Sequence, residues 1–560
     1  MGPTGFPALL SRNGVAAKWL RVDIACYGVI LGVFASSRVL VGRAGVRFDI
    51  SPLDYYYQYI DPRLLTDRLL ESLLFLHGQP PLFNLFLGLV LKVGGRAPPG
   101  LFHAIYLGLG LSLAFLMYGL CRHLNVGRGL ALAGVSLAVI SPSFILNENE
   151  LIYTLPVAAL MLVCVHSFSG AIVSGNSRGL LVSFMAIALL VGMRSSYHLA
   201  LLVAVMLYSW LVVGRSVRRK VLVASAIPLI LASSFYVKNV IIFGRFTTST
   251  WLGMNLWHVT AQALPPERRE ALVQDGLLEI SDRHSFLPLG SYPTWLWVDA
   301  QASCAGPPVL CAREKSTGAT NFNHIAYIRI SDTYLRDDLY ALTHEATIVL
   351  RRALSGIVHY YWPGSTFEHL ATNRETISTW NAVWERYVYG RAVIPGRTES
   401  PEWSRYWFPN LIAANGVAMA WAMGALVRSI GRMGGKRTGR GEIALGMIGL
   451  LLVYSIVVSN AFEYGENMRF RAEVEPLSIV ALLAAIASLS TRLMRAAGGR
   501  SNPSSAQGSR EGEFRSDVHT GEHPTNNTES GSSNPPLSRV PGPAKRRDHS
   551  MATYLKCSCS

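Results

Sequence analysis

The stretch LHGQPPLFNL, residues 76–85, decides the predicted topology of the chain. It opens an apolar run, 80–95, which is about 16 residues long and therefore at the lower edge of what crosses about 30 Å of hydrocarbon. The run begins with Pro80 and Pro81, and such a step suits the entry of a helix better than its middle. We therefore expect a re-entrant or interfacial helix here, with His77 and Gln79 at its foot.

The other apolar runs are longer. Of the 560 residues, 50% are hydrophobic and only 15% are charged, with a mean hydropathy of +0.29. The apolar residues gather in runs of about 20, which is typical of an all-α polytopic membrane protein with additional interfacial helices. The first run follows no signal-peptide pattern, so we expect it to be retained as an anchor. Ten crossings are expected, at 22–41, 101–121, 129–146, 151–170, 179–194, 197–213, 220–237, 408–428, 442–461 and 474–494.

Basic loops predict the sidedness of these crossings. The loops richest in Arg and Lys are 215–220 (RSVRRK) and 428–440 (RSIGRMGGKRTGR), which the positive-inside tendency places in the cytoplasm. The basic loop at 122–128 lies on the same side as these two loops only if the run at 80–95 does not cross the membrane. Both termini are then cytoplasmic in a multi-pass protein of the cell membrane. The segments expected outside are 43–100, the turns near 147–150 and 194–197, 238–407 and 462–473.

Four regions follow from this arrangement. They are 1–237, a transmembrane module that includes the first external loop; 238–407, an external soluble domain that is either mixed α/β or mostly helical; 408–497, further transmembrane helices; and 498–560, whose Ser, Gly, Pro and Asn content predicts a disordered cytoplasmic tail. Cys304 and Cys311 are the close cysteine pair of the external domain. If that domain faces an oxidising compartment, the two either form a disulfide or stay as thiols.

Several function classes are disfavoured. The formal net charge of +16 comes mostly from Arg and Lys that flank apolar runs, where basic residues fix topology and meet anionic lipid, so we expect no nucleic-acid partner. The sequence contains no P-loop, Rossmann fingerprint, HExxH or CxxC motif. The histidines of 238–407 lack the spacing of metal ligands, so no zinc site is expected there.

Acidic residues and tyrosines are interleaved in the first external loop. Asp49 and Asp54 stand next to the aromatic run YYYQY at 55–59. A carboxylate just above the hydrocarbon and shielded by aromatic rings is in a setting where it can become a general base. For Asp67 and Glu71, further along, we favour the exposed face of an amphipathic helix instead.

Three further clusters fall in segments that are expected to be external. The turn NENE contains Glu148 and Glu150, which either belong to a site or cap the ends of helices. Arg194 and His198 lie at a break between apolar runs, where an arginine needs a partner. Arg469 and Arg471 would be external against the usual charge bias, and they either bind an anionic phosphate or pair with the neighbouring glutamates.

The order of these elements resembles that of the GT-C glycosyltransferases, and in particular the branch of protein O-mannosyltransferases and aminoarabinose transferases. The stretches LHGQPPLFNL, FYVKNVIIFGRFTTSTWLGMNL and ENMRFRAEVEPL are similar to bacterial members of that branch, over roughly residues 20–495. Relatives usually carry an acidic pair such as Asp-Glu in the first loop. This chain has neither DE nor DD there, so the identity of the base stays open between Asp49 and Asp54.

The resemblance implies a fold and an activity. The fold would be GT-C-like, with the catalytic module in 1–237. The activity would be inverting transfer of a sugar from a polyprenyl-phosphate donor to a protein, lipid or glycan acceptor outside the membrane, with a first-loop Asp as base. His77, Gln79, Glu148, Glu150, Arg194, His198, Arg469 and Arg471 would then bind substrate. A divalent metal ion could share the task of the arginines, but these residues do not argue for one.

Two other classes of function remain as alternatives. A lipid or solute transporter, including a flippase, is disfavoured because no internal repeat of interrupted helices is visible and the polar clusters lie at one face instead of at mid-membrane. A non-catalytic envelope assembly protein is the other alternative.

Overall fold

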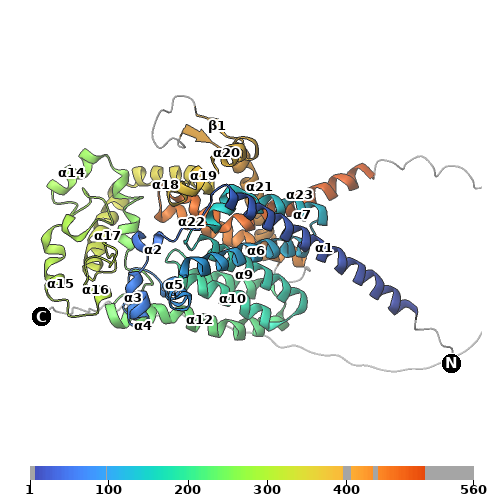
Figure 1. The fold of residues 1–560 in the computed structure, drawn as a ribbon, viewed down its shortest axis with the longest axis horizontal. Helices are drawn as coiled ribbons and strands as arrows, with labels where there is room; N and C mark the ends of the chain where they lie inside the picture. Colours follow the sequence, from blue (N-terminus) through green and yellow to red (C-terminus); the bar gives the residue numbers. More distant parts are fainter. Residues whose placement is uncertain (1–6, 96, 395–404, 433–438, 499–560) are drawn as a thin grey trace, which may run out of the picture. The chain divides into compact units, whose positions relative to one another are not determined.

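The computed structural model describes residues 7–95, 97–394, 405–432 and 439–498, which belong to one compact unit. The expected tail therefore lies outside the described residues from 499 onwards. The N-terminal part is helical throughout (Figure 1). Its helices are α1 (Pro7–Arg43), α2 (Pro52–Tyr55), α3 (Pro62–Asp67), α4 (Leu69–Leu74), α5 (Pro81–Gly94), α6 (Pro98–His123), α7 (Arg128–Val139), α8 (Pro142–Glu148), α9 (Thr154–Ser174), α10 (Ser177–Met193), α11 (Leu199–Val212) and α12 (Arg215–Phe243).

The middle of the chain consists of shorter elements. The α-helices are α13 (Leu252–Leu256), α14 (Pro266–Gln274), α15 (Val298–Ala302), α16 (Pro308–Cys311), α17 (Ala326–His344), α18 (Ala346–Tyr360), α19 (Ala371–Thr376) and α20 (Ser378–Val383). The remaining turns of helix are η1 (Ala261–Ala263), η2 (Leu289–Ser291), η3 (Thr294–Leu296), η4 (Gly364–Thr366), η5 (Glu368–Leu370) and the π-helical η6 (Trp384–Val388). An antiparallel pair, β1 (Ala392–Val393) and β2 (Tyr406–Trp407), is the only sheet among the described residues. The C-terminal helices are α21 (Pro409–Gly431), α22 (Arg440–Phe462) and α23 (Asn467–Gly498).

Seven described helices are long and apolar enough to cross a membrane, or eight if the bent pair α7–α8 is one span. The chain is therefore a predominantly α-helical, multi-pass membrane protein. Two further expected spans form the shorter apolar helices α10 and α11, so the count of ten stays a prediction. The run after the Pro-Pro step forms α5, a helix of 14 residues with Pro81 in its first turn, as the Pro-Pro step suggested. Whether it is re-entrant or interfacial stays a prediction.

Local sequence explains where several helices end. The bend of 57° between α7 and α8 falls at Ser141 and Pro142. The Ser141 hydroxyl accepts a hydrogen bond from the Phe144 amide, and the proline begins the new helix, so the two residues restart helical structure in another direction. Helices α9 and α12 both end at a glycine with positive φ, Gly175 and Gly244, which is the backbone that terminates a helix most easily.

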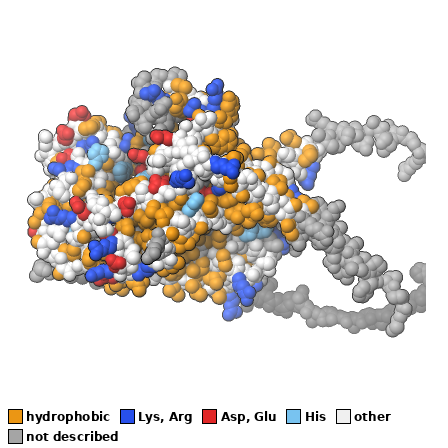
Figure 2. Space-filling view, in the orientation of Figure 1, with side chains coloured by type: hydrophobic (Ala, Val, Ile, Leu, Met, Phe, Trp, Pro, Cys, Tyr) orange, Lys and Arg blue, Asp and Glu red, His pale blue; other side chains and the backbone are white. Residues whose placement is uncertain are grey.

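The bundle is built around α9, which packs against α6, α10, α22 and α23. The middle segment has a second hydrophobic cluster of its own, with Trp251, Trp257 and Tyr334 at its centre. On the face drawn in Figure 2, hydrophobic side chains gather over the helix bundle, whereas Lys, Arg, Asp and Glu are mixed over the part that contains α14 to α17. Cys304 and Cys311 form a disulfide in that part.

The segments that the charge pattern placed on one side of the membrane contact one another. The first loop bonds to the turn after α8, the turn after α10 bonds to α23, and the middle segment bonds to the first loop. Their common side is therefore consistent with the predicted topology. Which side faces the cytoplasm stays a prediction.

Candidate active site

Asp49 and the acidic turn after α8 are joined through their backbones. The Asp49 amide donates to the Asn149 carbonyl, and the Asp49 carbonyl accepts from the Leu151 amide, each at 2.9 Å. This is an isolated parallel bridge that places Asp49 beside Glu150. The Ser51 amide donates to Oδ1 of Asp49 at 2.8 Å and orients that carboxylate. Two acids about a hundred positions apart in the chain are thus held side by side.

Glu150 is the buried member of this pair. It is only 1% exposed, and its Oε1 atom has no hydrogen-bond partner among the described residues. Burial, with the nearby charge of Asp49, raises the pKa of Glu150 to about 9. Glu150 therefore holds its proton at neutral pH beside Asp49.

Arg469, on α23, reaches the first loop. Its Nη1 atom donates to the hydroxyl of Tyr56 at 2.8 Å and lies 3.1 Å from a carboxylate oxygen of Glu466. The ring centroids of Phe367 and Tyr153 lie 5.1 and 5.6 Å from the guanidinium carbon. The side chain is 2% exposed, yet Nε has no hydrogen-bond partner among the described residues. A buried guanidinium with an unused N–H is suited to an anionic ligand.

The other two predicted arginines are paired inside the protein. Arg194 forms a buried ion pair with Glu473, whose second oxygen accepts from Tyr197. Arg471 lies 3.0 Å from Glu475. These pairs correspond to the salt-bridge alternative that the sequence left open. Arg194 nevertheless lies near the candidate site, because its guanidinium sits 4.8 Å from the centre of the Tyr153 ring that Arg469 also approaches.

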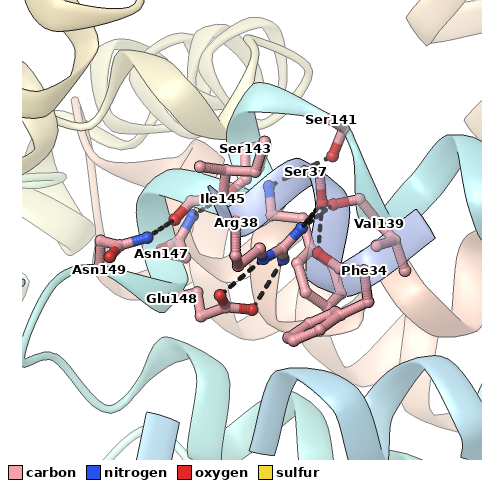
Figure 3. A network of polar contacts seen from close by, with 11 residues as sticks. Phe34, Ser37, Arg38, Val139, Ser141, Ser143, Ile145, Asn147, Glu148 and Asn149 are labelled. Atoms are coloured by element: carbon pink, nitrogen blue, oxygen red, sulfur yellow. Dashed lines mark hydrogen bonds and ion pairs between the residues drawn. The ribbon is translucent and has the colours of Figure 1, made fainter. Parts of the chain in front are cut away.

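Glu148 is held by a residue that the sequence analysis missed. Figure 3 shows Arg38 of α1 clamping its carboxylate, with Nε and Nη2 donating to the two oxygens at 2.7 Å each. Nη1 of Arg38 donates to the Val139 carbonyl at 2.7 Å. The bidentate pair neutralises both charges and fixes α8 against α1. A signal was present, because an arginine inside an apolar run requires a partner.

His369 is a second residue that the sequence analysis did not place in a site. Its Nδ1 atom lies 2.9 Å from the Tyr55 hydroxyl, and the two rings are stacked with centroids 5.5 Å apart. Burial lowers the pKa of His369, and the charges acting on it include those of Glu466, Arg469 and Asp49. His369 therefore lies within electrostatic range of both Asp49 and Arg469.

The HGQPP turn connects the first loop to the middle segment. The ring nitrogens of His77 lie 2.7 Å from the Thr250 hydroxyl and 2.9 Å from the Asn323 carbonyl, and its amide donates to Oδ1 of Asn323 at 2.8 Å. Burial lowers the pKa of His77 to about 3. Gln79 beside it is 5% exposed. Both side chains are thus enclosed at a joint between segments, and the contacts of His77 do not bring it to Asp49 or Arg469.

Asp54 and His198 also stand apart from this cluster. The Asp54 side chain is exposed and makes no hydrogen bond or ion pair within the described part of the chain. His198 is exposed too; its amide donates to the Tyr454 hydroxyl at 2.9 Å, and its Nδ1 atom lies 3.3 Å from that of Tyr236. Between the two candidate bases, the surroundings favour Asp49.

A divalent metal ion needs several ligands held close together. Among the described residues, no group of three or more His, Cys, Asp or Glu side chains has the arrangement that holds a metal ion. The residues present therefore do not fit the divalent metal that the resemblance allowed.

Two cavities with mostly apolar linings lie beside Glu475, the partner of Arg471. A cavity of about 190 Å³ lies between α7, α21 and α23, and its lining includes Leu137, Ala414 and Ile479. A smaller cavity shares Glu475 and Ile479 with it and extends to Thr154, the neighbour of Tyr153. The linings of these two cavities do not include Asp49, Glu150 or Arg469.

Comparison with protein-family models, with curated proteins and with solved structures finds no match to this chain.

Proposed function

We propose that the chain is a membrane glycosyltransferase that moves a sugar from a polyprenyl-phosphate donor to an acceptor outside the cytoplasmic membrane. The observation that supports this most directly is that Arg469 contacts Tyr56 and Tyr153, which belong to the two segments that the backbone bridge between Asp49 and Glu150 joins. The transfer needs a base for a hydroxyl and a cation for a leaving phosphate, and these two groups come from opposite ends of the chain.

Asp49 is the base in this proposal. Its carboxylate accepts the proton of the acceptor hydroxyl while the hydroxyl oxygen attacks the anomeric carbon from the face opposite the phosphate. The bond between that carbon and the phosphate oxygen breaks, and the polyprenyl phosphate leaves with the electron pair, so the configuration is inverted. Glu150, protonated, keeps a second negative charge away from Asp49 and preserves room for the acceptor.

Arg469 stabilises the leaving group. Charge grows on the phosphate in the transition state, and a preorganised donor in a site shielded from water stabilises that charge more than water does. The unused Nε of Arg469 is the donor, while Tyr56 and Glu466 hold the rest of the guanidinium. The cavity of about 190 Å³ between α7, α21 and α23 would take part of the isoprenoid chain.

The test is an assay of the full chain in lipid nanodiscs with radiolabelled polyprenyl-phosphate sugars and an extract of envelope acceptors. Transfer that is lost in Asp49→Asn and kept in Asp67→Asn supports the proposal, because Asp67 is an exposed acid of the same loop. Translocation of lipid or solute that survives Asp49→Asn, without any transfer, would instead favour the transporter. Glycan and lipid profiling of a deletion strain then identifies the sugar and the acceptor.

A further inference from the structure

A hairpin of the middle segment reaches over the first loop next to the candidate site. Residues 313–321 form it, with an isolated antiparallel bridge between Glu314 and Thr320 and a turn at Gly318, whose φ is +83°. Thr317 at the tip donates from its hydroxyl to the Asp54 carbonyl at 2.8 Å. Ser316 donates to Asp61, from its amide at 2.6 Å and from its hydroxyl at 2.5 Å.

Lys315 carries the innermost of these contacts. Its ammonium donates to the backbone carbonyl of Tyr56 at 2.8 Å, and the residue is only 5% exposed. The nearest carboxylates are Asp61, which is already bonded to Ser316, and Asp54. No ion pair of Lys315 is found within the described part of the chain. Burying an ammonium group in this way costs free energy, so the contact with Tyr56 is not an incidental surface feature.

Tyr56 is held from two directions. Lys315 binds its carbonyl, and Arg469 binds its hydroxyl at 2.8 Å. The ring between these two contacts is 1% exposed and touches Tyr153 through a hydroxyl to hydroxyl distance of 3.2 Å. A displacement of the Tyr56 backbone would therefore move the hydroxyl that orients Arg469.

We propose that Lys315 is a positioning residue of the candidate site, which holds Tyr56 so that the Nε atom of Arg469 stays directed at an anionic ligand. The nature of that ligand, a lipid-linked phosphate, rests on the proposed function; the restraint of Tyr56 and Arg469 by Lys315 does not. The external segment would thus help to build the site of the transmembrane module instead of only covering it.

The test compares variants of the full chain in lipid nanodiscs. Lys315→Met removes the ammonium, Lys315→Arg keeps a donor, and Thr317→Ala removes only the contact at the exposed tip. Lys220→Met is the control. Lys220 also donates to a backbone carbonyl, that of Gly175, but it lies on the exposed surface and contacts none of the residues of the candidate site. The readouts are the affinity for undecaprenyl monophosphate, hydrogen exchange of 54–61 and 467–471, and the melting temperature.

We expect Lys315→Met to lower the affinity about tenfold, the effect of one charge-assisted hydrogen bond. Lys315→Arg should recover most of it, Thr317→Ala should show a smaller fall, and Lys220→Met should bind like the wild type. Hydrogen exchange should become faster at 54–61 and 467–471 in Lys315→Met, with little change in melting temperature.

Two results would overturn the inference. One is an unchanged affinity in Lys315→Met; the other is a loss of affinity that follows a fall in melting temperature and that Lys315→Arg does not rescue, because that describes a structural lysine only. If the wild type does not bind the phosphate lipid, the proposed function fails and hydrogen exchange decides alone. Faster exchange at 467–471 then supports the restraint, and unchanged exchange refutes it.

Discussion

The Nη1 atom of Arg469 donates a hydrogen bond to the hydroxyl of Tyr56 at 2.8 Å, across 413 positions of the chain. This contact ties α23 to the first loop and brings the end of the membrane bundle next to the residues that pair with Glu150. The site therefore depends on three segments that meet at one end of the bundle.

Asp49→Asn should reduce sugar transfer by roughly 10²- to 10⁴-fold, since it removes the base but keeps the shape of the side chain. The oxygen of the asparagine can still accept from the Ser51 amide, so binding and folding should change little. Asp54→Asn should stay within about threefold of the wild type, a change of well under 1 kcal/mol. Initial rates at saturating donor distinguish the two variants, and the opposite ranking would make Asp54 the base.

Arg469→Gln should lower the turnover number by roughly 10²- to 10³-fold, because it removes the cation that faces the leaving phosphate. Tyr56→Phe should cost about tenfold, since it keeps the charge and loses only one hydrogen bond that orients it. The comparison requires turnover and donor affinity to be measured separately. Equal losses in both variants would mean that Tyr56 and not Arg469 contacts the ligand.

The apolar runs of the sequence predicted where helices form, but they did not predict which polar side chains contact one another. The run at 80–95 forms the 14-residue helix α5 where a helix was expected. That it does not cross also rests on the charge pattern and stays a prediction, because α11 has the same length and is expected to cross. The partner of Glu148 could not be found in this way, because Arg38 is 110 positions away. The same holds for His369 and Tyr55, which are 314 positions apart. Residue types indicate that a partner is needed, whereas only the packing of helices selects it.

The role of His77 in substrate binding stays a prediction, and its contacts show what a sequence position leaves open. A histidine beside a Pro-Pro step at the expected membrane surface favoured a role in substrate binding. The structure instead uses both ring nitrogens to join the first loop to Thr250 and Asn323. Sequence proximity to candidate residues is thus weaker evidence than the hydrogen bonds that a side chain makes.

His77→Ala should therefore affect stability more than chemistry. It removes two buried hydrogen bonds and leaves a cavity, which together cost about 2–4 kcal/mol. Transfer per folded molecule should remain within about twofold. The wild-type pKa of about 3 means that this histidine is neutral in the fold, so its contribution is present above pH 6.5 and is lost as the pH falls towards 3. Melting curves at pH 7.5 and pH 5 check this, and a His77→Ala protein that melts like the wild type but is inactive would return His77 to the site.

For the Arg38–Glu148 pair we expect that the losses of stability of the single variants do not add up in the double variant. Arg38→Met leaves Glu148 buried without its cation and should destabilise the protein by about 3–5 kcal/mol. The double variant Arg38→Met with Glu148→Leu should recover more than half of that loss, since neither charge remains buried alone. Melting temperature and transfer activity are measured on Arg38→Met, on Glu148→Leu and on the double variant. A double variant that is stable but inactive would show that Glu148 also contacts substrate.

The raised pKa of Glu150 leads to a prediction of how the stability of the fold depends on pH. Its pKa is about 9 in the folded protein, whereas the carboxyl of the unfolded chain ionises near 4.5. Between these two pH values the folded state holds a proton that the unfolded state has lost, so this group makes the protein less stable as the pH rises. Glu150→Gln imitates the protonated form and removes that loss, which should stabilise the protein by on the order of 2 kcal/mol at pH 7 and by almost nothing at pH 4.5. The two melting temperatures should therefore separate steadily from pH 5 to pH 8.5, with the exposed Asp67→Asn following the wild type throughout. Parallel curves for the wild type and Glu150→Gln would mean that Glu150 is ionised in the fold, and the carboxyl pair could not then leave Asp49 as the one charged base.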